Sequence, residues 1–139
     1  MKVQPKLSLA QSERLRYLRG IALKNRVGRA ATDFVFVQRN GKRMSLKEVK
    51  ADYVLLYLND PECSACKQIK EALENSEIIS RWKNSGRMKV VSVCIEGMTG
   101  GWKNIPAPAG WVDGCDDARK LLEEDLYDLR NLPAIYLLD

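Results

Sequence analysis

Apolar runs alternate with segments of helical spacing, and this order predicts the secondary-structure elements. Runs rich in β-branched and aromatic residues predict buried strands, because such side chains pack well on a pleated sheet. Apolar residues three to four positions apart predict helices. Residues 96–114 hold five glycines and two prolines, which predicts an irregular excursion long enough to carry function. The predicted strands cover 33–37, 53–58, 88–95 and 134–138, and the predicted helices cover 9–25, 46–50, 67–74, 77–83 and 116–126. Alternating strands and helices are typical of an α/β sheet covered by helices.

Two cysteines, Cys63 and Cys66, stand between the predicted strand at 53–58 and a predicted helix. The turn-forming residues 59–62 precede them. Two intervening residues place both sulfurs within bridging distance on the first helical turn, where free amides and the partial positive charge of the helix stabilise a thiolate. A thiolate attacks a disulfide, whereas a thiol does not. The pattern therefore predicts a dithiol redox site.

Two segments carry a resemblance to a known family. Residues 61–67 read Pro-Glu-Cys-Ser-Ala-Cys-Lys, and residues 132–139 read Leu-Pro-Ala-Ile-Tyr-Leu-Leu-Asp. Together they resemble the thioredoxin-like superfamily, and within it the TlpA-like branch of envelope thiol–disulfide oxidoreductases. The entry segment at 30–34 fits the same branch, and the resemblance covers roughly residues 27–139. It implies a thioredoxin-like fold for residues 30–139, with a central mixed sheet flanked by helices, preceded by a basic helical lead-in at residues 1–29.

The resemblance also implies roles for single residues. Cys63, at the helix opening, would be the attacking thiolate, and Cys66, one turn further in, would resolve the mixed disulfide. Pro133 takes the family position of a cis-proline whose loop faces the dithiol. The implied partners are protein thiol or disulfide substrates and a redox partner protein, and no cofactor is implied. Substrate contacts are expected at Leu132, Pro61 and Trp111.

The chain departs from the family at its C-terminus. A complete fold of this kind continues after the proline-led strand with an edge strand and a closing helix, whereas this chain stops at Asp139. We therefore expect the C-terminal edge strand and helix to be missing. The open sheet edge that results could be covered by a homodimer, because unpaired backbone groups there are free to pair with another chain.

Charge is uneven along the chain, which has a formal net charge of +5. Residues 1–30 contain eight Lys and Arg residues but a single acidic one, Glu13. The first interpretation is a solvated helix face, because Leu15, Leu18 and Ile21 repeat at helical spacing. The second is contact with nucleic acid or another anionic surface. Tyr17 alone makes no stacking platform, so a nucleic-acid partner is not expected.

The sequence leaves two cellular locations for this protein. No stretch approaches 18 uninterrupted apolar residues, so no membrane span is expected. The first residues have no apolar core and do not form a signal peptide. The resemblance implies a periplasmic or cell-envelope protein whose leader is not present in this chain. The alternative is a cytoplasmic protein.

Two further cysteines have less informative surroundings. Cys94 lies in an apolar strand, and Cys115 is expected to begin a helix after Gly114. Buried, inert thiols are one interpretation, and a Cys94–Cys115 disulfide is the other. A metal site is not expected, because the chain has no histidine and these two cysteines do not form a close pair in sequence.

Two other functions remain as alternatives to disulfide exchange. The chain could be a non-catalytic thioredoxin-like binding module with a structural dithiol. It could also be a thiol peroxidase, although Asp60 stands where that chemistry wants Thr or Ser three residues before the reactive cysteine.

Overall fold

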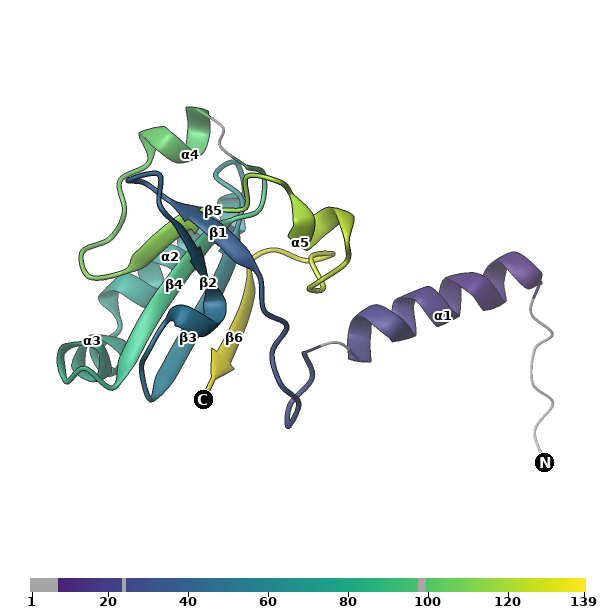
Figure 1. Ribbon diagram of the computed structural model, residues 1–139, viewed down its shortest axis with the longest axis horizontal. Coiled ribbons are helices and arrows are strands. Elements are labelled where there is room, and N and C mark those ends of the chain that lie inside the picture. The colour runs from purple at the N-terminus through teal and green to yellow at the C-terminus, as the bar shows by residue number, and fades with distance from the viewer. Residues whose placement is uncertain (1–7, 24, 98–99) are drawn as a thin grey trace.

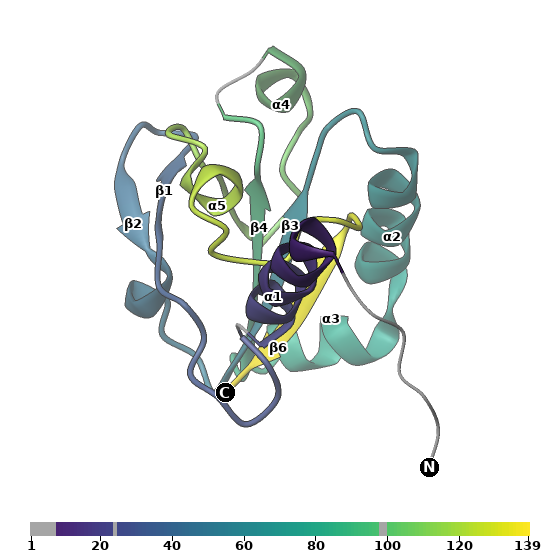
Figure 2. The ribbon, with the colours of Figure 1, turned by 90° about the vertical axis from the view of Figure 1, so that its right-hand side faces the viewer.

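The computed structural model describes residues 8–23, 25–97 and 100–139, and within them it shows one mixed six-stranded sheet with helices on both faces (Figures 1 and 2). The helical elements are α1 (Leu9–Leu23), the 3-10 helix η1 (Leu46–Glu48), α2 (Ser64–Asn75), α3 (Glu77–Asn84), α4 (Gly100–Asn104) and α5 (Lys120–Glu123). The strands are β1 (Val35–Gln38), β2 (Arg43–Ser45), β3 (Tyr53–Asn59), β4 (Met88–Cys94), β5 (Val112–Cys115) and β6 (Ala134–Leu138).

The order of strands across the sheet is β2-β1-β5-β4-β3-β6. The three central strands β3, β4 and β5 run parallel, and β1, β2 and β6 pair antiparallel with their neighbours. The carboxyl ends of parallel strands meet at one edge of a sheet, where ligand and reaction sites commonly lie. The Cys-x-x-Cys segment follows β3 at that edge.

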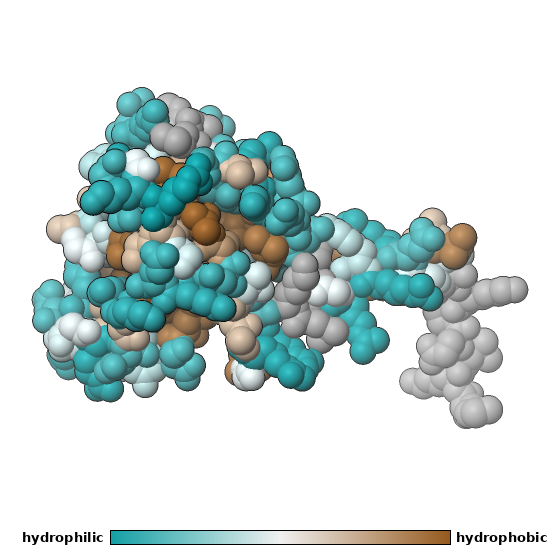
Figure 3. Space-filling view, viewed as in Figure 1, coloured by the Kyte–Doolittle hydropathy of each residue, from teal (hydrophilic) through white to brown (hydrophobic). Residues whose placement is uncertain are grey.

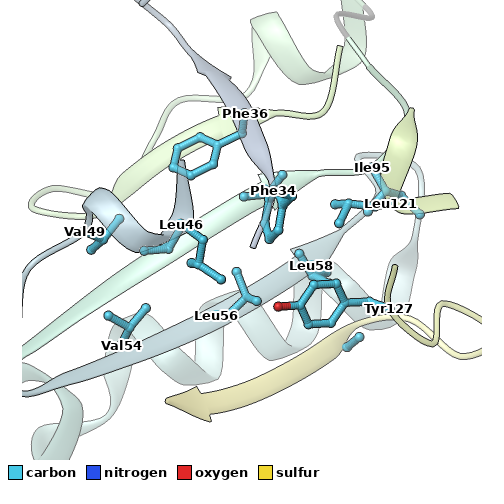
Figure 4. Close-up of a cluster of buried hydrophobic side chains, with 13 residues drawn as sticks. Phe34, Phe36, Leu46, Val49, Val54, Leu56, Leu58, Ile95, Leu121 and Tyr127 are labelled. Atoms are coloured by element: carbon cyan, nitrogen blue, oxygen red, sulfur yellow. The ribbon is translucent and has the colours of Figure 1, made fainter. Parts of the chain in front are cut away.

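Alternating residues of the central strands build two apolar layers. Leu56 and Leu58 point to one face, where they pack with η1, α5 and Tyr127 in the largest buried cluster (Figure 4). Leu55, one residue before Leu56, packs on the opposite face beneath α2 and α3. Leu56 and Leu58 are fully buried, and burying a leucine side chain contributes about 1.5–3 kcal/mol. The predicted α/β sheet covered by helices is thereby confirmed.

A single serine separates α2 from α3, as the sequence predicts near residues 75–76. Ser76 ends α2 and is the N-cap of α3, and its hydroxyl accepts a hydrogen bond from the Ile79 N–H at 3.4 Å. A hydroxyl at the N-cap satisfies one of the unpaired N–H groups of the first turn. The chain can therefore change direction here and keep both helices on one face of the sheet.

Three expectations for residues 96–126 differ from the structure. The excursion at 96–114 is not wholly irregular, because it contains α4 and ends in β5. Cys115 ends that strand and does not begin a helix. The expected helix at 116–126 shortens to α5, because Arg119 and Asp125 adopt left-handed backbone angles, with φ of 55° and 50°.

Helix α1 projects from the body of the molecule (Figure 1), and its surface is largely hydrophilic (Figure 3). Leu15 and Tyr17 on this helix are 53% and 45% exposed. The Tyr17 hydroxyl bonds the Asp125 carboxylate at 3.0 Å, which ties the helix to the loop after α5. None of the described helices is long and apolar enough to cross a bilayer.

The expected open edge is present at β6. Among the described residues this strand pairs on one side, with β3. Its side chains Ile135 and Leu137 are 41% and 59% exposed.

Candidate dithiol site

A tight turn after β3 sets the start of α2. The carbonyl of Asp60 accepts a hydrogen bond from the Cys63 N–H at 3.1 Å, and the Asp60 carboxylate accepts one from the Glu62 N–H at 3.0 Å. Asp side chains stabilise such turns by pairing with backbone two residues on. The turn places Cys63 at the N-cap position of α2.

Cys63 uses its sulfur as the cap of α2. Its Sγ accepts a hydrogen bond from the Cys66 N–H at 3.2 Å, which satisfies one of the unpaired amides of the first turn. This amide and the positive end of the helix stabilise negative charge on the sulfur. The Cys63 side chain is half-buried, and its Sγ lies 3.9 Å from the carbonyl oxygen of Leu132.

Cys66 lies one turn further along α2 and is 2% exposed. Burial, together with the hydrogen bond to Cys63, raises the pKa of the Cys66 thiol to about 12. The backbone at Cys66 is held in place by the Tyr57 hydroxyl, which donates to the Cys66 carbonyl at 2.5 Å. The two cysteines therefore differ in the way that sequential roles require, with one sulfur reachable and the other protonated and covered.

A cavity of about 50 Å³ lies beside Cys66, between α2 and the segment that contains α4. One wall is a polar row across the three parallel strands, because Tyr57, Ser92 and Asp113 are register partners and face the same side of the sheet. A volume of this size holds a few water molecules. Its other lining residues are Arg39, Asn59, Asp60, Pro61, Lys67, Lys70, Trp102, Ile105, Pro106 and Pro108.

Long cationic side chains bind the backbone of residues 102–109 to the rest of the molecule. The guanidinium of Arg39 donates to the carbonyls of residues 102, 103 and 105, and it lies 4.6 Å from the centre of the Trp102 ring. Lys70 donates to the Pro106 carbonyl at 3.4 Å, and Lys83 donates to the Ala109 carbonyl at 3.0 Å. Hydrogen bonds from charged donors contribute about 1.5–3 kcal/mol each.

Arg39 also pairs with Asp113 in the cavity wall. Burial raises the pKa of the Asp113 carboxyl, while Arg39 opposes this effect. This ion pair joins the turn after β1 to β5 in the lining of the cavity.

The expected substrate-contacting residues lie in different surroundings. Pro61 lines the cavity, and Leu132 turns its carbonyl toward Cys63. The bond between Leu132 and Pro133 is cis. Trp111 packs edge-on against Tyr57, with ring centres 6.2 Å apart, and joins the apolar cluster beneath α2 and α3. Among the described residues, the tryptophan that lines the cavity is Trp102 and not the expected Trp111.

Sequence reasoning missed Tyr57 and Arg39. Tyr57 reads as one more aromatic residue of a buried strand, and only the path of α2 brings its hydroxyl to Cys66. Arg39 follows a predicted strand in an exposed turn, and nothing near it in sequence indicates contact with residue 102.

Cys94 and Cys115 are both buried, at 1% and 0% exposure, and both are free thiols. Among the described residues, no three or more Cys, Asp or Glu side chains gather in a way that could hold a metal ion.

Solved structures resemble the chain over most of its length. A thioredoxin-like protein from Bacteroides caccae matches with a TM-score of 0.92 and 32% identity over 97% of this chain. The chain spans about half of that protein, 50% of its length. The C-terminal domain of an uncharacterized protein from Bacteroides fragilis matches with a TM-score of 0.80 and 32% identity, covering 83% of this chain and 84% of that domain.

A solved structure with lower sequence identity shares the fold. A domain of a "possible thiol-disulfide isomerase" from Cytophaga hutchinsonii matches with a TM-score of 0.69 at 24% identity, over 84% of this chain and 80% of that one. No protein-family model matches the chain, and no curated protein matches it. The chain belongs to the thioredoxin-like superfamily.

Proposed function

We propose that this protein is a thiol–disulfide oxidoreductase that exchanges disulfides with protein substrates through Cys63 and Cys66. The observation that supports the proposal most directly is the hydrogen bond from the Cys66 N–H to the Cys63 Sγ at the opening of α2. It gives the reachable sulfur a backbone donor at the start of a helix, and such donors stabilise a thiolate.

The first step uses Cys63 alone. Its thiolate attacks one sulfur of a substrate disulfide, so a Cys63–substrate bond forms and the substrate S–S bond breaks. The leaving substrate sulfur departs as a thiolate and takes a proton from solvent. Cys66 stays a thiol during this step, because burial raises its pKa to about 12.

The second step uses Cys66. Its sulfur gives up a proton and attacks the Cys63 Sγ, which lies one helical turn away. The Cys63–Cys66 disulfide forms, and the second substrate sulfur leaves as a thiolate that takes up a proton. The substrate gains two electrons and the dithiol loses them, so a redox partner protein must reduce the disulfide before the next cycle.

Substrate binding is proposed for residues around the Cys63 sulfur. The Leu132 carbonyl lies beside it, and Pro133 follows Leu132 without an N–H of its own, so neighbouring backbone is left for an extended substrate segment. Pro61 would contact the substrate on the side of the cavity. Trp111 would contribute to substrate binding indirectly, by supporting the Tyr57 ring against which it packs.

Three further proposals concern the setting of this activity. We propose that residues 30–139 form the catalytic unit and residues 1–29 a basic lead-in, which the solvent-facing α1 supports. We propose an envelope location, which rests on the TlpA-like resemblance. We propose that the edge of β6 supports homodimers, and size exclusion at several concentrations tests this through a shift of the elution volume.

Reduction of insulin disulfides tests the proposed activity. The parent protein should accelerate reduction, and Cys63→Ser should abolish the acceleration. Cys66→Ser should lose turnover and accumulate a mixed disulfide. Glu74→Gln, an exposed change near the other end of α2, is the control and should keep the parent rate. Parent rates in both cysteine variants would contradict the proposal. No acceleration by the parent protein would favour a binding module, and peroxide consumption that needs Cys63 would favour a thiol peroxidase.

A further inference from the structure

A second pair of thiols lies in register at the end of the parallel strands. Cys94 on β4 is the register partner of Cys115 on β5. The same row continues to Asn59 on β3 and to Val37 on β1. Register partners on neighbouring strands present their side chains on the same face of the sheet, so the two cysteine side chains lie on one face, one strand spacing apart.

The spacing suits a disulfide. Neighbouring strands lie about 4.7–4.9 Å apart, and cysteines in disulfides have Cα atoms about 4.4–6.8 Å apart. Cys94 is the last residue of β4 and Cys115 is the last residue of β5. Strand ends adjust more easily than strand centres, so the Cβ atoms can approach within the roughly 3.5–4.5 Å that the bond requires.

The pair is covered from one side. Cys94 and Cys115 form a small cluster with Val37 and Trp102, separate from the main core. Burial raises the pKa of each thiol to about 11. Trp102 comes from α4, a short helix that lies beyond this end of the sheet in both ribbon views (Figures 1 and 2).

Arg39 holds that cover in place. Its guanidinium stacks on the Trp102 ring and donates to the carbonyls of residues 102, 103 and 105. Displacement of α4 would therefore break several charged hydrogen bonds at once, and until that happens a disulfide reagent cannot reach the thiols.

The pair lies close to the proposed dithiol site. Trp102 borders the cavity beside Cys66 on one side and packs with the Cys94 and Cys115 side chains on the other. The charge of Asp60 acts on both Cys66 and Cys94. The two thiol pairs thus share one end of the sheet, and Trp102 contacts the surroundings of both.

We propose that Cys94 and Cys115 are a second, shielded dithiol that closes to an intramolecular disulfide when a disulfide oxidant reaches it, with Trp102 and α4 as the shield. One thiol attacks the oxidant RSSR, forming a Cys–SR bond and releasing RSH. The other thiol displaces the second RSH as the Cys94–Cys115 bond forms. The pair loses two electrons and two protons, and the oxidant gains them as two thiols.

The test uses the full chain with Cys63→Ser and Cys66→Ser, so that it does not depend on the proposed catalytic pair. This double variant is equilibrated with oxidised and reduced glutathione at graded ratios. The expected result is loss of both remaining thiols together, with the mass of a protein that has lost two hydrogens. Both thiols remaining free at every ratio would overturn the proposal, as would a glutathione adduct on one cysteine without closure.

A further substitution checks the assignment and the fold. Cys94→Ala in the same background should keep the circular dichroism spectrum of its parent and lose the closure. Closure that persists in this variant would overturn the assignment, because it would have to join Cys115 to another molecule.

The shield has its own matched pair of variants. Arg39→Ala in the same background should speed closure by about tenfold or more, because the lost hydrogen bonds hold α4 over the thiols. Arg87→Ala is the control, because Arg87 likewise pairs with a carboxylate, that of Asp52, and stacks on an indole, that of Trp82, at the opposite end of β4. Equal closure rates in the two variants would overturn the role given to Trp102 and α4.

Discussion

Alkylation of Cys66 should be strongly suppressed at neutral pH in a variant that lacks Cys63. Burial is the largest cause that raises the Cys66 pKa from 9.0 to about 12. Each pKa unit lowers the thiolate fraction tenfold well below the pKa, so the shift in the parent protein corresponds to about 1,000-fold at pH 7; the variant keeps the burial but loses the contributions of Cys63, so its thiolate fraction should fall by less than this and still by well over tenfold. Since iodoacetamide reacts with the thiolate, the rate should fall by about the same factor.

The assay follows a single peptide. Cys63→Ser is treated with iodoacetamide between about pH 7 and 10, and the carboxamidomethylated Cys66 peptide is quantified by mass spectrometry. The rate should rise about tenfold per pH unit across the whole range without a plateau. The same variant unfolded in urea provides the ordinary thiol for comparison, and Cys63 in a Cys66→Ser variant provides the reachable one.

Two outcomes would refute this reasoning. A plateau of the Cys66 rate below pH 9 would mean that burial does not hold the thiol protonated. A folded-to-unfolded rate ratio within about tenfold at pH 7 would mean that the side chain is not covered. Either result would remove the physical basis for attack by Cys63 first and resolution by Cys66 second.

Three further predictions concern stability. Gly114→Ala should lower the free energy of unfolding by about 1–3 kcal/mol in urea melts, because an added Cβ would lie 2.7 Å from a backbone oxygen of β1. Gly20→Ala, where nothing lies within 4 Å, is its control, and equal effects would contradict the explanation. Tyr57→Phe should cost about 1 kcal/mol by removing the hydroxyl bond to the Cys66 carbonyl, and an unchanged urea midpoint would show that this bond contributes nothing. Stability should fall as pH rises above about 9, by about 1.4 kcal/mol per pH unit for each buried thiol. The reason is that the pKa values of these thiols in the folded protein, about 11 to 12, exceed the value in the unfolded chain, so the unfolded chain ionises first. Cys94→Ala should make stability fall less steeply with pH, and an unchanged slope would refute the assignment of this pH dependence to the buried thiols.

The dithiol could be predicted from sequence because its signals are local. The strand at 53–58 is a continuous apolar run, and Cys63 follows it after a turn, so the position of the sulfur at the start of a helix needs no long-range information. Strands β4 and β6 were predictable for the same reason, since each is a long β-branched or apolar run.

Strand β5 could not be predicted, because its signals are not local. Asp113 and Gly114 occupy half of its four residues, and neither favours a strand. The segment is extended because β4 and β1 pair with it on both sides. Gly114 is required there because the ring of Phe36 and the backbone of β1 leave no room for a side chain.

The cavity beside Cys66 could not be predicted from the sequence for a related reason. Its polar wall consists of Tyr57, Ser92 and Asp113, which lie on three strands and meet only through their register. The same register brings Cys94 to Cys115, a pair that sequence spacing had left open. Composition cannot reveal which residues share a row, because the row depends on how the strands align.

Trapping of a mixed disulfide tests the central claim most directly. Cys66→Ser is incubated with insulin, quenched with acid and digested without reduction, and the linked peptides are identified by mass spectrometry. The proposed mechanism predicts an insulin cysteine joined to Cys63, and much less adduct on Cys66 in the Cys63→Ser variant. Absence of an adduct on Cys63, or equal adducts on the two cysteines, would contradict the assignment of Cys63 as the nucleophile.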